Sequence, residues 1–119
     1  GENMKVSDVA TVFGFEELCA ASAEQPVRAG YTSDLLSDVM AKAKDDSVLI
    51  TIQAHKNSVA VATLVGIRAI VICNSRPVPD DMKDAAKSEG IAIYRTDLSQ
   101  FEVSGLLYTA LKEASEGNF

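Results

Sequence analysis

The side chains best suited to chemistry follow the β-rich segments of this sequence. His55, the only histidine, is followed by Lys56 and Asn57 and is separated by two residues from the apolar run 47–52. Similar polar groups follow three other extended segments, and the candidate ligand-binding residues are Ser33, Asp34, His55, Lys56, Asn57, Asn74, Ser75, Arg76 and Thr96. Their hydroxyl, amide, imidazole and cationic groups can donate hydrogen bonds to an anion. Helix N-termini beside Lys or Arg favour an anionic metabolite or a nucleotide.

A second interpretation of the same residues is structural. Ser, Thr, Asn and Asp at helix starts commonly cap the helix, and Ser33 and Asn57 are placed to do so. His55 has no nucleophile at a spacing that would make a catalytic pair, so a hydrogen-bonding loop role is favoured. We predict no catalytic residue, and a small enzyme using His55 is the less favoured alternative.

Stronger chemical motifs are absent from the sequence. It contains no GxxxxGK[ST], GxGxxG, HExxH or GxSxG pattern, so the usual machinery for phosphoryl transfer, dinucleotide binding, zinc proteolysis and serine hydrolysis is missing. Cys19 and Cys73 lie among apolar neighbours without CxxC spacing, which predicts reduced core thiols. Neither a cofactor nor a metal site is predicted.

The elements that must position these residues alternate between strand and helix. The β-branched runs 47–52 and 69–73 predict strands buried on both faces, with further strands at 91–94 and, more weakly, at 15–21 and 27–32. Gly14, Gly66 and Gly90 are placed to end helices. Helices joining β-rich runs predict a three-layer α/β/α domain with a mainly parallel sheet. Since ligands bind at the carboxyl ends of parallel strands, the candidate residues are expected at one edge.

Helix starts and faces are also predicted. Ser7, either Ser33 or Asp34, and either Asn57 or Ser58 are expected N-caps, and Asp80 is expected to begin a helix after Pro79. Ser99 and Glu102 form a capping box for the last helix. The predicted buried faces are Leu35, Leu36, Val39, Met40 and Ala43 in one helix, and Val103, Leu106, Leu107, Ala110 and Leu111 in the last.

Composition limits the class of protein. A chain of 119 residues with 47% hydrophobic content predicts one domain over residues 1–119, with residues 1–3 ahead of Met4 interpreted as a cloning remnant. A net charge of −6 disfavours nucleic acid and anionic membrane surfaces as partners. We find no signal peptide and no run long enough to span a bilayer, so a soluble cytoplasmic protein is expected.

Three segments resemble DRTGG-domain proteins: VRAGYTSDLLSDVM at 27–40, ITIQAHKNSVAVA at 50–62 and ICNSR at 72–76. The resemblance covers residues 4–111. EQPVRAG at 24–30 stands where the family's motif belongs and keeps only its last glycine, Gly30, so the motif is degenerate. The resemblance implies a fold similar to the N-terminal domain of HPr kinase/phosphorylase. It also implies a regulatory role, and self-association as a homodimer.

Two functions therefore remain open beside the enzyme alternative. The first is a non-catalytic regulatory module that senses a small anionic ligand at the carboxyl ends of the strands. The second is an interaction or dimerisation module that docks onto a metabolic or redox enzyme. A pocket among the candidate residues would favour the first function, and a large exposed apolar patch would favour the second.

Overall fold

The order of helices and strands follows the predicted alternation. The structure is a computed structural model that describes residues 4–115, so the interpretation of residues 1–3 as a remnant lies outside the described residues. The elements are α1 (Val6–Phe13), β1 (Glu16–Cys19), β2 (Ala29–Thr32), α2 (Leu36–Lys42), β3 (Ser47–Thr51), α3 (Lys56–Val65), β4 (Ala69–Ile72), α4 (Asp80–Glu89), β5 (Ala92–Arg95) and α5 (Gln100–Ser115).

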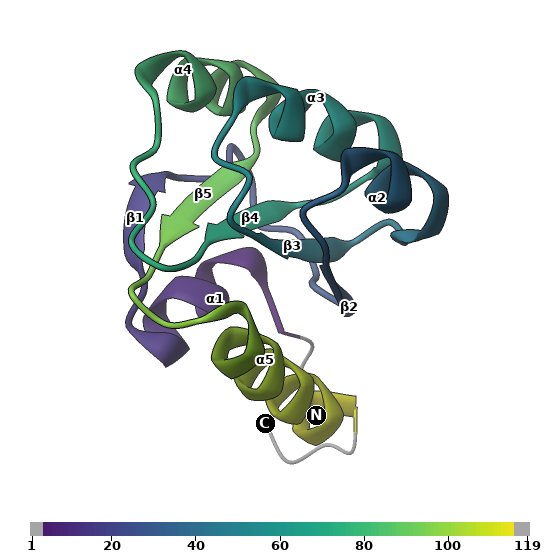
Figure 1. Cartoon of the computed structure of the whole chain (residues 1–119). Coiled ribbons are helices and arrows are strands. Elements are labelled where there is room, and N and C mark those ends of the chain that lie inside the picture. The colour runs from purple at the N-terminus through teal and green to yellow at the C-terminus, as the bar shows by residue number, and fades with distance from the viewer. Residues whose placement is uncertain (1–3, 116–119) are drawn as a thin grey trace.

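The strands form one mainly parallel sheet in the order β1-β5-β4-β3-β2. Strands β2 to β5 are parallel to their neighbours, and β1 joins the edge of the sheet antiparallel to β5. Helices α2, α3 and α4 cover one face, while α1 and α5 lie against the other (Figure 1). This confirms the predicted three-layer α/β/α architecture.

Two apolar cores form because alternate residues of each strand point to opposite faces of the sheet. On the side of α1 and α5, the sheet contributes Val48, Ile50, Ala69, Val71, Ala92 and Tyr94. On the side of α2, α3 and α4 it contributes Leu49, Ile70, Ile72 and Ile93. Every residue of β3 and β4 is buried, which explains why these strands read as unbroken apolar runs.

The predicted helix ends are confirmed, and three predicted helix starts are wrong. Gly14, Gly66 and Gly90 end α1, α3 and α4 with φ of 72°, 80° and 72°. Ser7 lies inside α1, where the N-cap is Lys5 and its N–H donates to Asp8 Oδ2 at 2.8 Å.

The start of α2 lacks the predicted cap because its N-cap residue is apolar. The N-cap is Leu35, and neither Ser33 nor Asp34 takes that position. The N-cap of α3 is His55, whose Nδ1 accepts from the Asn57 N–H at 3.0 Å, so Asn57 and Ser58 are already helical. The side-chain cap of α3 therefore comes from a neighbour of the predicted residues, whereas the N-cap residue of α2 makes no side-chain capping bond.

The last two helices begin as predicted. Helix α4 starts at Asp80, directly after Pro79. At α5 the capping box is formed, because the Ser99 N–H donates to Glu102 Oε1 at 3.1 Å and the Glu102 N–H donates to Ser99 Oγ at 3.2 Å. The reciprocal bonds fix where the longest helix begins.

Three apolar residues expected to be buried are exposed. Leu35 and Met40 on the α2 side are 63% and 50% exposed, and Leu106 in α5 is 42% exposed. Helix α2 is short and packs at the sheet edge, so only Val39 is fully buried from it. Leu106 lies to one side of the face of α5 that buries Val103, Leu107 and Ala110.

Candidate functional site

The four segments that carry the predicted site residues lie at one edge of the sheet. In the parallel register Thr32 pairs with Ile50, Thr51 with Ile72, and Ile72 with Arg95, so the strands end at a common level. The loops that follow β2, β3, β4 and β5 therefore emerge side by side, as expected from the topology. In this structure each candidate residue lies at this carboxyl edge, although a role in ligand binding stays a prediction.

Asp34 ties three elements together at this edge. Its Oδ1 accepts hydrogen bonds from Thr51 Oγ1 at 2.8 Å, from the Ile52 N–H at 2.9 Å and from Gln100 Nε2 at 2.9 Å. Thr51 is fully buried at the end of β3, and Gln100 is the first residue of α5. Asp34 therefore joins the β2–α2 loop to the centre of the sheet and to the opposite helical layer.

Three other candidates use their side chains to hold the local backbone. Ser33 Oγ accepts from the Leu35 N–H at 3.2 Å, and Thr96 Oγ1 accepts from the Leu98 N–H, also at 3.2 Å. His55 Nδ1 caps α3, and an accepting Nδ1 carries no proton, so Nε2 is the ring's donor. These side chains support the edge of the sheet rather than project freely from it.

The remaining candidates are exposed, and their side chains make no hydrogen bond or ion pair within residues 4–115. They are Lys56 and Asn57 at the start of α3, and Asn74, Ser75 and Arg76 after β4. The two groups follow β3 and β4, which are parallel neighbours in the sheet. Two cations and three hydrogen-bonding side chains are thus available to a ligand at the ends of the two central strands.

The turn after β4 has an uncommon backbone. Asn74 and Ser75 have φ of 59° and 53°, and the Arg76 N–H donates to the Cys73 carbonyl at 3.3 Å. The N–H groups of Asn74 and Ser75 donate to the carbonyls of Leu98 and Thr96. Left-handed non-glycine residues are disfavoured, and such conformations concentrate at functional loops. The bonds to the next loop hold this turn in place.

A polar pocket of about 320 Å³ opens at the β5 end of the same edge. It is lined by Gly14, Glu16, Ser75, Arg95, Thr96 and Asp97. Arg95 Nε pairs with Glu16 Oε1 at 2.8 Å, so its charge is already matched, and Asp97 adds a second carboxylate. This pocket does not favour an anion. Sequence analysis missed Gly14 and Glu16, because the antiparallel pairing of β1 with β5 brings them there.

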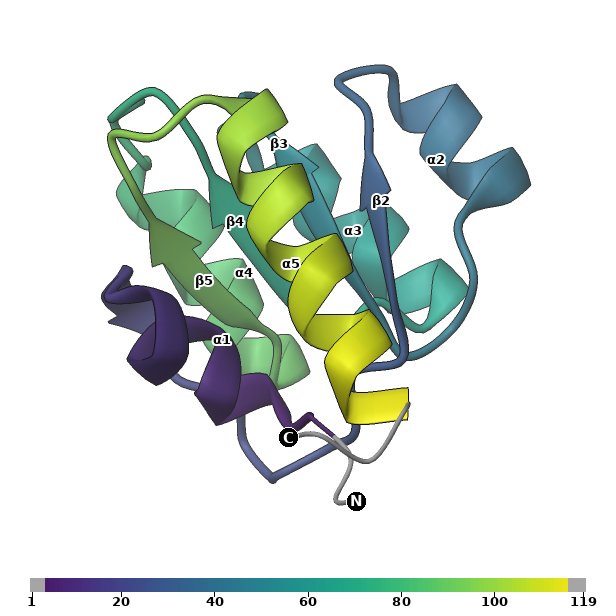
Figure 2. The same ribbon diagram turned by 90° about the horizontal axis from the view of Figure 1, so that it is seen from below.

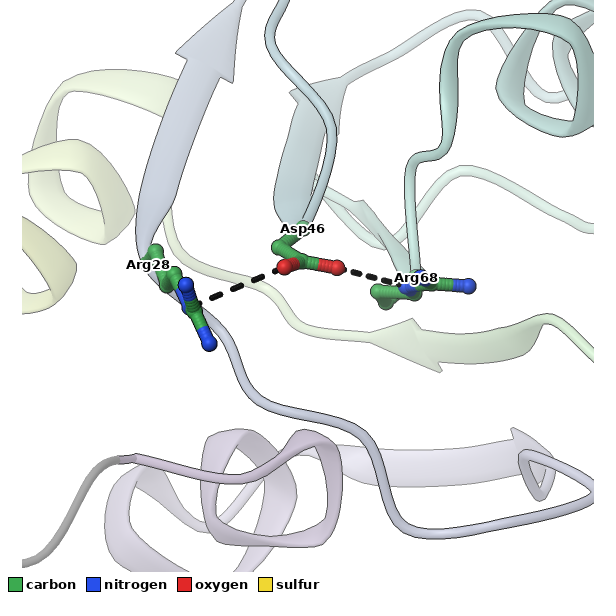
Figure 3. A network of polar contacts seen from close by, with 3 residues as sticks. All are labelled: Arg28, Asp46 and Arg68. Carbon is green, nitrogen blue, oxygen red and sulfur yellow. Dashed lines mark hydrogen bonds and ion pairs between the residues drawn. The ribbon is translucent and has the colours of Figure 1, made fainter.

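The opposite, amino edge of the sheet is closed by paired charges (Figure 3). Asp46 Oδ1 lies 2.9 Å from Arg68 Nε, and its Oδ2 lies 3.6 Å from Arg28 Nε. The Asp46 backbone also accepts from the Arg28 N–H and donates to the Gly66 carbonyl. This network joins the starts of β2, β3 and β4, and both arginines already face a carboxylate.

Few side chains of the described residues are arranged for catalysis or for metal binding. An enzyme using His55 would need a carboxylate such as Asp34 or Asp97 within hydrogen-bond reach of the imidazole. Within residues 4–115, neither is hydrogen-bonded to His55, and no cluster of His, Cys, Asp and Glu could hold a metal ion. Both cysteines are free thiols. Burial, assisted by the negative charge of Asp34, raises the pKa of Cys73 to about 11, which disfavours the reactive thiolate.

The fold of this chain is similar to that of a protein region of known structure. No family model matches the sequence, and no curated protein matches it. The structural likeness is to the CBS and DRTGG domains of the regulatory region of a Clostridium perfringens pyrophosphatase, solved with its activator, diadenosine tetraphosphate. The TM-score is 0.70 with 10% sequence identity, and the match covers 85% of this chain and 44% of that chain.

At this identity the likeness shows the fold and nothing finer. It supports the DRTGG-like fold that the sequence segments predict, while the degenerate motif and the likeness to HPr kinase stay predictions. The match covers less than half of the pyrophosphatase region. The ligand and the assembly of that protein therefore cannot be assigned to this chain from the match. Within residues 4–115, no helix is long and apolar enough to cross a membrane.

Proposed function

We propose that this protein is a non-catalytic regulatory module that binds a small anionic metabolite or nucleotide at the carboxyl ends of β3 and β4. The observation that carries the proposal is that Lys56 and Arg76, two exposed cations without an ion pair in residues 4–115, follow neighbouring parallel strands. The ligand would bridge them across the Asn74–Ser75 turn.

Two further observations support the proposal. The start of α3 carries the partial positive charge of a helix N-terminus beside Lys56. The fold is shared with a regulatory region whose activator is a nucleotide with four phosphates, which makes an anionic nucleotide a reasonable first probe. Within residues 4–115 His55 has no carboxylate partner, so the enzyme alternative has less support than binding.

The test is a thermal-shift and calorimetric titration of the full chain with ATP and diadenosine tetraphosphate. A ligand present at about one hundred times its Kd adds roughly 2.7 kcal/mol to the free energy of unfolding. The variant Lys56→Ala/Arg76→Ala is expected to bind about tenfold more weakly, since each partly exposed ion pair contributes up to about 1 kcal/mol.

A matched control separates a local effect from net charge. Lys42→Ala/Lys87→Ala removes the same charge from exposed lysines in the last turns of α2 and α4, near the opposite edge of the sheet. It should bind like the wild type. If neither nucleotide stabilises the wild type, or if both double variants weaken binding equally, this function is wrong.

A second function is favoured by a separate feature of the surface. An apolar groove of about 630 Å³ runs between α1 and α5, and Phe101, Val12 and Leu106 on its walls are 88%, 51% and 42% exposed. Exposed apolar surface of this kind marks interaction sites. We infer that the module also associates with protein, with a homodimer as the first candidate and a metabolic or redox enzyme as the second.

A further inference from the structure

The carboxyl ends of β4 and β5 are the place where the following loops diverge. Helices α2, α3 and α4, which follow β2, β3 and β4, cover one face of the sheet, whereas α5, which follows β5, covers the other (Figure 2). Because β4 and β5 are parallel neighbours, the loops 73–79 and 96–99 leave adjacent strand ends toward opposite faces. Diverging loops leave a crevice at the strand ends, which is where ligands bind in open α/β sheets. A ligand site is therefore expected over this part of the edge.

The polar pocket of about 320 Å³ lies at this place. Ser75 comes from the loop after β4, and Thr96 and Asp97 come from the loop after β5. Gly14 and Glu16 complete the lining from the segment that enters β1, which is paired with β5. The Ser75 N–H donates to the Thr96 carbonyl at 2.8 Å, so a backbone hydrogen bond joins the two loops. The two loops are thus held together within the fold of the single chain.

The lining of the pocket carries an unmatched negative charge. Glu16 Oε1 lies 2.8 Å from Arg95 Nε, so these two charges offset each other. Asp97 is exposed, and its side chain makes no hydrogen bond or ion pair within residues 4–115. It shares the pocket with the hydroxyls of Ser75 and Thr96, which can accept hydrogen bonds as well as donate them. The pocket therefore presents acceptors and one carboxylate without a partner.

We propose that this pocket binds a small organic cation that carries a primary ammonium group, at a site separate from the anion site proposed at β3 and β4. An ammonium has three N–H donors and no acceptor. Acceptors for these donors are the carboxylate of Asp97, the second carboxylate oxygen of Glu16 and the hydroxyl of Ser75. The overall charge of −6 attracts cations to the surface. The small volume and a lining without apolar side chains favour a short, polar amine.

The same lining disfavours other kinds of cation. Calcium takes six to eight oxygen ligands, and within residues 4–115 no group of three His, Cys, Asp or Glu side chains could hold a metal ion. Quaternary ammonium groups are recognised by aromatic rings, and no aromatic residue lines this pocket. A primary ammonium matches the lining because its N–H groups can use the hydrogen-bond acceptors.

The backbone of Ser75 supports a binding role for its hydroxyl. Its φ of 53° lies in the left-handed region, which glycine adopts without strain and serine does not. Its side chain makes no hydrogen bond within residues 4–115, so the described fold does not use the hydroxyl. Strained residues of this kind are concentrated at ligand sites. Serine at this position brings a hydrogen-bonding group into the pocket, whereas glycine would only relieve the strain.

The test is a titration of the full chain with ethanolamine and with putrescine at constant ionic strength, followed by the amide signals in two-dimensional NMR spectra. Saturable shifts are expected at residues 14–16, at Ser75 and at residues 95–97. Tetramethylammonium carries the same charge as ethanolamine but has no N–H group. It should bind at least about tenfold more weakly, because its charge cannot be matched by hydrogen bonds.

Three variants locate the site. Asp97→Asn should weaken ethanolamine binding about fivefold, as expected for the loss of a partly exposed ion pair. Asp45→Asn removes the same charge from an exposed residue beside Asp46 at the amino edge and should bind like the wild type. Ser75→Gly should weaken binding without loss of thermal stability, because it removes the hydroxyl and the backbone strain together. A residue with a purely structural role would not separate binding from stability in this way.

Three results would overturn the proposal. They are the absence of saturable shifts with both amines, binding of tetramethylammonium as tight as that of ethanolamine, and an Asp97→Asn variant that binds no more weakly than Asp45→Asn. Titration with ATP reports separately on the anion site, because Asp97→Asn should bind ATP at least as tightly as the wild type. Failure of one site is thus distinguishable from failure of the other.

Discussion

Replacing Asp34 tests whether this residue holds the fold rather than a ligand. In Asp34→Ala, the Thr51 hydroxyl and the Ile52 N–H lose an acceptor at 2.8 and 2.9 Å. Thr51 is fully buried, and its Oγ1 also accepts from the Gln53 N–H at 3.0 Å, which limits how it can reorient. Each unsatisfied donor costs about 1 kcal/mol or more. The exposed Gln100 amide adds about a few tenths of a kcal/mol, so we expect the free energy of unfolding to fall by about 2–3 kcal/mol in total.

The assay is urea unfolding followed by circular dichroism. With a slope of about 1–3 kcal/mol per molar urea, the midpoint should fall by about 1 M. Asp34→Asn keeps an accepting Oδ1 and should lose less than about 1 kcal/mol. Asp84→Ala is the control, at an exposed aspartate of α4 whose side chain makes no hydrogen bond within residues 4–115. A loss for Asp34→Ala no larger than the control's would refute the assignment of Asp34 as a structural tie.

Three further predictions concern the rest of the fold. Gly66→Ala should lower the free energy of unfolding by about 2–3 kcal/mol, and Gly14→Ala by about 1 kcal/mol, as measured by chemical unfolding. Both glycines have positive φ, but only at Gly66 would an added Cβ meet another atom closely, Asp45 Cβ at 2.8 Å. Equal losses for the two variants would contradict this. Asp46→Asn should lower the free energy of unfolding by about 0.5–1 kcal/mol at low salt and by less at high salt, because the two arginine partners of Asp46 are partly exposed. A loss that does not depend on salt would contradict this. Burial raises the pKa of Tyr94 to about 12 from 10.0, so this side chain stays neutral in both states below pH 10, and between pH 10 and 12 only the unfolded chain releases its proton. The free energy of unfolding should therefore fall with rising pH in that window, and more steeply than in Tyr94→Phe.

The layers of the fold were predictable because their signals are local and redundant. The β-branched runs at β3 and β4 are buried on both faces, and glycines with positive φ end three helices. The place of β1 was not predictable. Its four residues are exposed or half-buried, and what fixes it is a non-local antiparallel pairing with β5. Long-range pairing of a weak edge strand leaves no pattern in its own sequence.

The location of the candidate site was predictable, but the use of each side chain was not. Parallel topology alone places the polar loops at one edge. Whether a serine or an aspartate there caps a helix depends on the distance to backbone groups a few residues away. Asp34 stands next to α2, yet it binds Thr51 and Gln100, which are distant in sequence. The sequence shows that such a residue can accept hydrogen bonds. It does not show which helix or strand supplies the donors.

The distribution of unpaired charge narrows where an anion can bind. The overall charge is −6, so most of the surface repels an anion. At the amino edge, Arg28 and Arg68 are already paired with Asp46, and at the β5 end Arg95 is paired with Glu16. An anion placed there would have to compete with a carboxylate. Lys56 and Arg76 form no ion pair within residues 4–115, so an anion at the ends of β3 and β4 would meet two cations that are not already paired with a carboxylate.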